Sequence, residues 1–289
     1  MDTFNEKIEK VFKENKIPII QYEELKKNKP AFAEGAFGKV FSGYYNNTKI
    51  ALKQMKFDKF EDELINEILN EIKTLSIAHE LTDQVPKFYG LWKGRKSVGL
   101  VLEFIEGKPL SKLSNLLTKK EKINIIVQLC QILKAIHSKN MIHRDLKPDN
   151  IIISNGLKVT LIDFGLCRIA KRIITMTNKP KGTPHYYAPE AVDIVESGDS
   201  DEYAFNISTK ADIWSVGVII SEIFSGVYPW SSLAKNQHHI NSLIIQQIDF
   251  PIPSNIESDI KEIIQQCVNY QIDERPTAEE IIEQLSKIN

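Results

Sequence analysis

The stretch MIHRDLKPDN, residues 141–150, packs an unusual number of polar groups into a short segment. Six of its side chains can carry charge or coordinate a cation: His143, Arg144, Asp145, Lys147, Asp149 and Asn150. It directly follows a long apolar run with helical spacing, which predicts a buried helix before it. A solvated turn is the simplest interpretation of such a stretch. The rest of the sequence argues against that interpretation.

A second polar segment lies close behind the first, in LIDFGL, residues 161–166. The intervening residues, IIISNGLKVTLI, predict a hairpin that returns Asp163 to the side of Asn150. An amide and a carboxylate then supply the hard oxygen ligands that Mg²⁺ takes. Asp145 can point at an incoming hydroxyl group, and Lys147 can balance charge on a transferring phosphoryl group.

The N-terminal half carries a glycine-bearing segment, AEGAFGKV, residues 33–40. Gly35 and Gly38 let backbone amides approach a ligand closely, as phosphate binding requires. On this motif alone a plain β-hairpin is the better interpretation.

Lys53 ends the strand-like segment IALK, where an alternating pattern places it on a buried face. A buried ammonium needs an anionic partner. Glu71, in the charged helix that follows, is one candidate, and Glu67 is its competitor one turn earlier on the same face. On the pattern alone each glutamate is more simply read as a solvated surface residue.

Bulk composition narrows the class of protein. A 289-residue chain with 42% hydrophobic and 26% charged residues is ordinary for a globular protein. Its net charge of −1 gives no reason to expect nucleic acid or an acidic membrane as a partner. Three widely spaced cysteines argue for a reducing compartment. No secretory signal and no apolar run long enough to span a membrane is present, so we expect a cytoplasmic protein.

The pattern along the chain predicts two differently built halves. Short strands are expected from about 30 to 104, notably at 39–45, 49–55 and 97–104, with one charged helix over 59–77. Helices dominate from 118 onward, where capping boxes at Thr118 and Thr277 each open a helix. The run ADIWSVGVIISEIF, residues 211–224, is apolar on nearly every side and predicts a central helix. An amphipathic helix over 4–15 is expected to pack on its own domain.

Taken together and in this order, HRDLKPDN, DFG, IALK, AEGAFGKV and the APE of residues 188–190 resemble the signature set of the eukaryotic protein kinases. The resemblance covers roughly residues 20–289 and makes the solvated turn untenable. It implies an α+β bilobal kinase fold forming a single domain over 1–289. The expected parts are an N-terminal helical extension (1–19), an N-lobe with an antiparallel sheet and one helix (20–104), and a mainly helical C-lobe (105–289).

The resemblance also implies ATP and Mg²⁺ as cofactors and a role for each matching residue. Lys53 would hold the α- and β-phosphates and pair with Glu71, Asn150 and Asp163 would bind Mg²⁺, and Asp145 would accept the substrate proton. The nucleotide-binding residues would be Gly35, Ala36, Phe37, Gly38, Val40, Ala51, Lys53, Leu102, Glu103, Ile105 and Ile152. Leu102 would be the gatekeeper, and residues 103–105 the hinge. Asp212 would anchor the catalytic loop, and Glu190 and Arg275 would form a structural ion pair.

Lys147 and Thr183 are similar to their counterparts in serine/threonine kinases, so protein substrates with Ser or Thr acceptors are expected. IIQYEEL, residues 19–25, is similar to the tyrosine-kinase-like group of these enzymes. The alternatives are a pseudokinase or scaffold that acts by binding, a dual-specificity kinase and a small-molecule phosphotransferase. The presence of Lys53, Asp145, Asn150 and Asp163 disfavours a pseudokinase. The oligomeric state stays open.

Four positions or segments suggest regulation or depart from the family pattern. Arg144 suggests pairing with a phosphate on Thr175 or Thr177, or a loop ordered without one. Ala33 replaces the first glycine of the phosphate loop, which predicts stiffer closure. Pro109 stands where relatives place a polar residue, so a preference for arginine-containing substrates is not expected. The acidic segment 191–209 predicts a structureless solvated loop, with a docking surface for a basic partner as the alternative.

Overall fold

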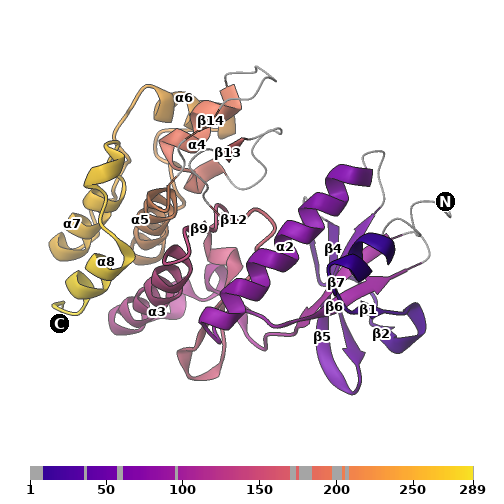
Figure 1. Ribbon diagram of the computed structural model, residues 1–289. Coiled ribbons are helices and arrows are strands. Elements are labelled where there is room, and N and C mark those ends of the chain that lie inside the picture. The colour runs from indigo at the N-terminus through magenta and orange to yellow at the C-terminus, as the bar shows by residue number, and fades with distance from the viewer. Residues whose placement is uncertain are drawn as a thin grey trace. The chain divides into compact units, whose positions relative to one another are not determined.

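The computed structural model describes residues 9–35, 38–56, 61–94, 97–169, 174–175, 184–196, 204–205 and 208–288. Its contacts divide the chain into two compact units, Met1–Glu106 and Gly107–Asn289 (Figure 1). The first unit is built on a sheet and the second mainly on helices, as the sequence pattern predicts and as the α+β kinase fold requires.

The first unit is one seven-stranded sheet with a long helix, α2 (Glu61–Leu81). Its strands are β1 (Ile19–Ile20), β2 (Leu25–Lys27), β3 (Ala33–Gly35), β4 (Gly38–Tyr45), β5 (Thr48–Lys56), β6 (Phe88–Lys93) and β7 (Ser97–Glu103). Their order across the sheet is β1-β6-β7-β5-β4-β2, with β3 paired to β4. The strands expected at 39–45, 49–55 and 97–104 are confirmed as β4, β5 and β7. The expected helix is confirmed and extends to Leu81, whereas β6 was not among the predicted strands.

The connection between β4 and β5 shows how the sequence dictates this sheet. Asn46 and Asn47 both have positive φ, 47° and 60°. Two consecutive residues of positive φ make the turn whose twist matches that of paired strands, and asparagine tolerates this conformation best after glycine. The turn closes the pair Tyr45 and Thr48 and thereby fixes the register of Val40 opposite Lys53.

Apolar side chains form separate cores on the two faces of this sheet. The first, here called the helix-side core, contains Phe12, Met55, Ile65, Ile68, Ile72, Leu91, Val98 and Leu100. The second contains Ile20, Leu25, Phe41, Ile50, Leu52, Trp92 and Val101. The two lists alternate along β5 and β7, as side chains of a strand do, so α2 packs on one face only.

The N-terminal helix occupies residues 9–14 of the described chain. Two apolar positions of the expected helix, Phe4 and Ile8, lie outside the described residues. Phe12 is fully buried in the helix-side core and Val11 packs against it. The expectation that this helix packs on its own domain is therefore confirmed.

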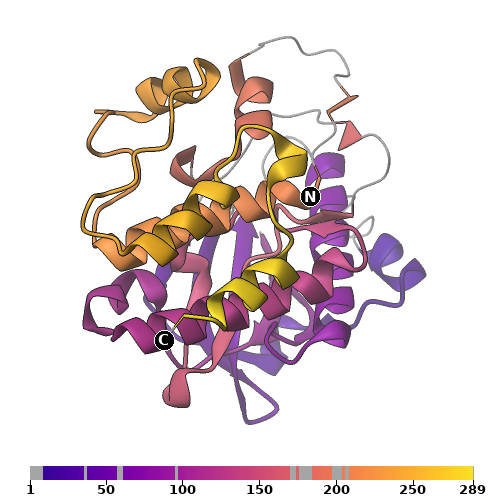
Figure 2. The same cartoon turned by 90° about the vertical axis from the view of Figure 1, so that its left-hand side faces the viewer.

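The second unit contains most of the helices. They are α3 (Lys119–His137), α4 (Pro189–Glu196), α5 (Lys210–Ser225), α6 (Gln237–Ile245), α7 (Ser258–Cys267) and α8 (Ala278–Leu285). Its short strands are β8 (Lys108–Pro109), β9 (Met141–Ile142), β10 (Ile151–Ile153), β11 (Val159–Leu161), β12 (Arg168–Ile169), β13 (Ile174–Thr175) and β14 (Ala204–Phe205). Capping boxes open α3 and α8 at Thr118 and Thr277, as predicted. The apolar helix α5 is central: α7 packs along it, and α8 packs along α3 (Figure 2).

The acidic segment 191–209 corrects one expectation. It is not structureless, because α4 continues through Glu196 and residues 204–205 form β14, which pairs with β13. Pro189 at the first position of α4 favours helix initiation, since its missing N–H needs no partner there. The acidic residues Asp199, Asp201 and Glu202 lie outside the described residues.

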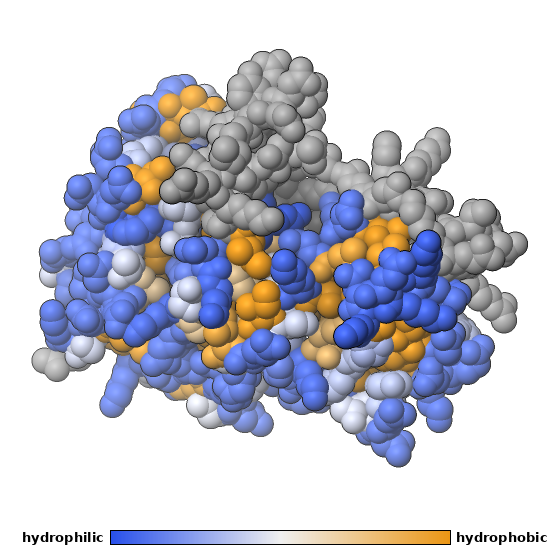
Figure 3. All heavy atoms as spheres, viewed as in Figure 1, coloured by the Kyte–Doolittle hydropathy of each residue, from blue (hydrophilic) through white to orange (hydrophobic). Residues whose placement is uncertain are grey.

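The described surface in the view of Figure 3 is mostly hydrophilic, with smaller apolar areas between the polar side chains. Among the described residues, no helix is both long and apolar enough to cross a membrane. The three cysteines are free thiols, and all are buried.

Candidate active site

The loop of residues 141–150 is held by the carboxylate of Asp212, which lies at the start of α5. Its Oδ2 accepts a hydrogen bond from the backbone N–H of His143 at 2.9 Å, and its Oδ1 accepts one from the N–H of Arg144 at 3.0 Å. The His137 Nε2 lies 2.8 Å from Oδ2. Burial alone raises the pKa of Asp212, but the hydrogen bond and charge of His137 and the backbone donors bring it below its usual value.

His143 occupies the buried centre of this loop. Its Nε2 lies 3.3 Å from the carbonyl of Ile162, and its Nδ1 accepts from the Asp145 N–H at 3.4 Å, an arrangement that fits the neutral ring protonated on Nε2. The ring packs edge-on against Phe164 at 4.9 Å. Burial lowers the pKa of His143 even though three aspartates nearby oppose the shift, so the ring is neutral at pH 7. His143 is therefore a structural support for the loop.

Asp145 is held by two side chains from the same loop. Lys147 Nζ donates to Oδ2 at 2.8 Å, and Asn150 Nδ2 donates to the same oxygen at 2.9 Å and to the Asp145 carbonyl at 2.7 Å. Asp145 is only 5% exposed. Among the described residues, both side-chain contacts use Oδ2, which leaves Oδ1 available to a hydroxyl group. Asp145, Lys147 and Asn150 thus converge in the structure, and the catalytic roles expected for them stay a prediction.

The hairpin expected between Asn150 and Asp163 is present. β10 pairs with β11 with Ile151 opposite Leu161, and the N–H of Ile162 donates to the Asn150 carbonyl at 2.9 Å. Asp163 therefore follows directly beside Asn150. Its φ of 65° is left-handed, a conformation that is uncommon for a side chain other than glycine and that recurs at functional sites.

The donor set of this corner fits a divalent cation of the Mg²⁺ type. Asn150 spends its amide N–H groups on Asp145, so its Oδ1 remains an acceptor, and Asp163 adds a carboxylate. Within the described part of the chain, no group of three or more His, Cys, Asp or Glu side chains gathers as a metal cluster. Mg²⁺ suits such a sparse set, because it keeps several water or phosphate oxygens besides one or two protein ligands.

Lys53 and Glu71 form a buried ion pair within the first unit. Lys53 Nζ lies 2.7 Å from Glu71 Oε1, and the side chains are 9% and 7% exposed. The cross-strand register puts Lys53 on the same face of the sheet as Val40 and Ala51, since directly paired residues of antiparallel strands share a face. The partner that the sequence analysis required for Lys53 is thus present, and it is Glu71 of α2.

The glycine hairpin of β3 and β4 is formed as an ordinary antiparallel pair, with Gly35 opposite Gly38. Gly38 has φ of 130°, and a Cβ there would lie 2.1 Å from the Gln54 carbonyl oxygen, so only glycine fits. Ala33 pairs with Val40 in extended β3, a conformation that alanine adopts without strain. Ala36 and Phe37, at the tip, lie outside the described residues.

The remaining nucleotide-contact candidates lie on strands or, for Ile105, just after one. Leu102 and Glu103 end β7, Leu102 opposite Ala51, and Ile105 follows half-buried. In the second unit Ile152 pairs with Pro109 of β8 and is half-buried. These positions are described, but their contacts with a nucleotide stay a prediction.

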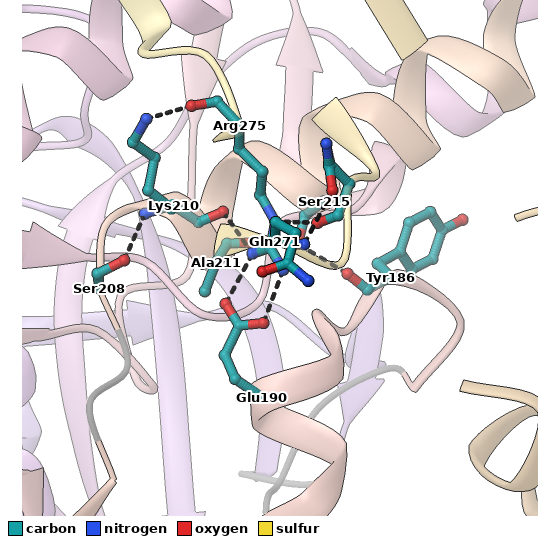
Figure 4. Close-up of polar contacts among 9 residues, drawn as sticks. Tyr186, Glu190, Ser208, Lys210, Ala211, Ser215, Gln271 and Arg275 are labelled. Atoms are coloured by element: carbon teal, nitrogen blue, oxygen red, sulfur yellow. Dashed lines mark hydrogen bonds and ion pairs between the residues drawn. The ribbon is translucent and has the colours of Figure 1, made fainter. Parts of the chain in front are cut away.

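Arg275 is the hub of a buried polar network that closes the second unit (Figure 4). Its guanidinium donates to both carboxylate oxygens of Glu190, at 2.7 and 2.9 Å, and to the carbonyls of Asn269 and Lys210. The Trp214 ring lies 5.2 Å away, a cation–π distance. The Glu190–Arg275 pair expected from the sequence is confirmed, and the bidentate geometry explains why lysine could not replace Arg275.

The regulatory prediction for Thr175 or Thr177, and the acceptor prediction that uses Thr183, fall on side chains outside the described part of the chain. Thr177 and Thr183 lie outside the described residues, and only the backbone of Thr175 is described, in β13. Arg144 itself is largely buried and has a left-handed φ of 70°. Burial and the nearby Arg168 lower its pKa to about 10, so it stays protonated at neutral pH.

His137 is the supporting residue that the sequence analysis missed. In the structure it lies at the end of α3, where its ring contacts Asp212, 75 positions away. No local pattern signals such a contact; its place in the last turn before the polar loop was the one available clue.

Comparisons with known proteins agree with this geometry. A family model described as "Protein kinase domain" matches residues 27–285. Similar proteins include MAP3K epsilon protein kinase 1 of Arabidopsis thaliana, 28% identical over 257 residues, which are 86% of this chain and 18% of that protein. Serine/threonine-protein kinase STY46 of Arabidopsis thaliana is 26% identical, with 89% of this chain and 43% of that protein covered. Mitogen-activated protein kinase kinase kinase ANP1 of the same plant is 31% identical, with 86% and 37% covered. The chain spans less than half the length of these curated relatives.

Proposed function

Because the chain belongs to the protein kinase domain family, we propose that it transfers the γ-phosphate of ATP to serine and threonine hydroxyl groups of protein substrates. The observation that carries this proposal is the arrangement at Asp145. Lys147 and Asn150 both hold its Oδ2, which leaves Oδ1 for an incoming hydroxyl. The names of the similar serine/threonine kinases support the same activity.

The chemistry assigned to the second unit is proton removal at a fixed carboxylate. The acceptor hydroxyl gives its proton to Asp145 as its oxygen forms a bond to the γ-phosphorus, and the bond from that phosphorus to the ADP oxygen breaks. Lys147, already 2.8 Å from Asp145, provides a positive charge beside the transferring phosphoryl group. Asp212 keeps the loop from moving as charge develops, because it holds two of its backbone N–H groups.

The first unit supplies the ammonium of Lys53 for the α- and β-phosphates, with Glu71 holding it in place. Asn150 and Asp163 would hold Mg²⁺, which when bound neutralises phosphate charge. Gly35, Ala36, Phe37 and Gly38 would cover the phosphates with backbone N–H groups. Val40, Ala51, Leu102, Glu103, Ile105 and Ile152 would contact the adenine. We treat 1–289 as a single kinase domain with residues 1–19 as its helical extension.

Serine and threonine are favoured over tyrosine because Lys147 contacts the catalytic carboxylate, the position at which the tyrosine-specific members typically lack lysine. A pseudokinase or binding scaffold is disfavoured, since the four residues that such proteins tend to lose are present. The free, buried cysteines fit a cytoplasmic location. The substrates are proteins, and nothing in the charge of the chain favours nucleic acid.

The test is phosphoryl transfer from ATP and Mg²⁺ to a degenerate peptide library, with Ser, Thr and Tyr acceptors scored separately. Asp145→Asn is the control, because it keeps the shape of the side chain but removes the base. We expect labelling of Ser or Thr that falls by about 10²–10⁴-fold in Asp145→Asn. Labelling confined to Tyr would contradict the assignment of Lys147, and ATP binding without transfer would favour the scaffold.

A further inference from the structure

Phe12 of the N-terminal helix is a core residue, although it lies ahead of the segment that the family model matches. Its side chain has 0% exposure and lies in the helix-side core together with residues from three strands and α2. Figure 1 shows this helix, in indigo, on the side of the sheet where α2 lies. Truncating a fully buried phenylalanine leaves a large cavity, so this helix is part of the packed fold.

The same core carries α2. Ile65, Ile68 and Ile72 point into it from one face of the helix and are 4%, 1% and 6% exposed. Glu71 directly precedes Ile72, so the depth and rotation of α2 against this core decide where the Glu71 carboxylate lies. In the structure, Glu71 Oε1 lies 2.7 Å from Lys53 Nζ. Leu102, the expected gatekeeper, also packs against the core.

The N-terminal helix is tied to the sheet by polar contacts as well as by Phe12. Glu9 of the helix and Lys93 of β6 form an ion pair, and this pair lowers the pKa of Glu9. After the helix, the Leu91 N–H donates to the carbonyl of Pro18, and β1 adds to β6 as a parallel strand. Gly90 permits this approach, because a Cβ there would lie 2.8 Å from the Pro18 oxygen.

The N-terminal helix docks through Phe12, which lies in the same core as the isoleucines of α2. Interiors are close-packed, so removing that ring leaves a cavity into which neighbouring elements shift. The strands of this core are joined to one another by ladder hydrogen bonds, whereas α2 contributes packed side chains, so α2 is the element that we expect to shift.

We propose that the N-terminal helix is an intramolecular clamp on α2 and that Phe12 is a positioning residue, which acts through Ile68 and Ile72 to keep Glu71 on Lys53. The consequence for phosphoryl transfer rests on the proposed function; the clamp itself does not. Undocking the helix, by mutation or by a partner that binds it, lowers the fraction of molecules in which the ion pair is formed.

The experiment compares three variants of the full chain with wild type. Phe12→Ala removes the ring, and Phe12→Leu removes less volume and keeps the fold if the alanine variant does not. Leu25→Ala is the matched control: it truncates a buried side chain of the same unit that lies in the second core, on the other face of the sheet. Hydrogen exchange of the backbone amides is followed by mass spectrometry in peptides from α2 and from β4, alongside urea unfolding.

We expect exchange in residues 64–75 of α2 to accelerate by about tenfold in Phe12→Ala and about threefold in Phe12→Leu, while β4 keeps its wild-type rate. Leu25→Ala is expected to accelerate β4 and leave α2 unchanged. Equal acceleration of α2 in Leu25→Ala, or no acceleration in either Phe12 variant, overturns the clamp, since Phe12 would then only stabilise the unit as a whole.

The kcat/KM of phosphoryl transfer provides a second test of the clamp. Where wild type transfers phosphate, kcat/KM is expected to fall in the Phe12 variants in proportion to the fraction of molecules that keep Glu71 on Lys53, because only the paired fraction is competent. A wild-type chain that transfers no phosphate contradicts the proposed function alone, because the exchange result still decides the clamp. Unchanged kcat/KM with faster exchange overturns the role of Phe12 as a positioning residue.

Discussion

Asp145 and Lys53 are both charged and both buried, yet the structure holds them in different ways. The contacts to Asp145 come from Lys147 and Asn150, within five positions of it in the same loop. Lys53 meets Glu71, eighteen positions away on another element. Asp145 is therefore placed by short-range hydrogen bonds, whereas Lys53 depends on where a helix packs.

The two parts of the site are therefore expected to respond to different perturbations. Hydrogen bonds are directional, so a loop fixed by Asp212 has one arrangement and fails when a donor or acceptor is removed. Apolar packing is not directional, so the position of α2 depends on the volume of every side chain in the helix-side core. A mutation far from the chemistry can move Glu71, while it would leave Asp145 in place.

The largest expected effect comes from breaking the ion pair on one side. Glu71→Leu leaves the buried Lys53 ammonium without the carboxylate 2.7 Å away and should cost about 3–5 kcal/mol of unfolding free energy in urea. The double variant Lys53→Met and Glu71→Leu removes both charges and should return to within about 1 kcal/mol of wild type.

Glu67→Gln is the matched control for the other glutamate on that face of α2, and it should cost less than about 1 kcal/mol. If the double variant is as unstable as Glu71→Leu, the pair is not the reason for the loss. A Glu67→Gln variant that matches Glu71→Leu would show that the two glutamates share Lys53.

A smaller effect is expected in the hydrogen-bonded loop. Asp212→Asn keeps the shape of the side chain but replaces one acceptor with an N–H₂ group, so either the His143 or the Arg144 N–H loses its partner. A buried donor left unsatisfied costs about 1–3 kcal/mol, to be read from urea unfolding. Asp273→Asn, the same change at an exposed position, should stay within about 0.5 kcal/mol. Equal losses in the two variants would mean that the contacts of Asp212 do not stabilise the fold.

The sequence could predict what short-range rules decide. The capping boxes, the hairpin that returns Asp163 to Asn150 and the all-apolar α5 follow from spacing and propensity, and all are present. Even the departure at Ala33 is explained locally, because β3 is extended there.

What the sequence could not decide depends on distant packing. Glu67 and Glu71 share one face of a helix, so only the docking of α2 selects between them. The contact of His137 with Asp212 joins residues 75 positions apart. The strand β14 within the acidic segment exists because β13 supplies its partner, and no two-residue strand is visible in a sequence pattern.

The smallest expected effect is on the pH dependence of stability. It concerns the hydrogen-bonded loop through His143 and not the ion pair of Lys53 and Glu71. Burial lowers the pKa of His143, against the charges of Asp212, Asp145 and Asp163. Below pH 6.5, the ordinary pKa of histidine, His143 therefore binds a proton in the unfolded chain but not in the folded one. The contribution of His143 to the free energy of unfolding is thus complete above pH 6.5 and falls as the pH decreases toward the folded pKa. Asp212, with a lowered pKa, acts in the same direction only below its own ordinary value of 3.8.

His143→Gln separates these terms, because glutamine can donate to the Ile162 carbonyl and accept from the Asp145 N–H without titrating. Between pH 7.5 and 5.5, wild type should lose more unfolding free energy in urea than His143→Gln does. His239→Gln, at an exposed position on α6, should keep the wild-type slope. Identical slopes in wild type and His143→Gln would mean that His143 titrates alike in both states, and the loop would then owe its rigidity to Asp212 without help from a neutral ring.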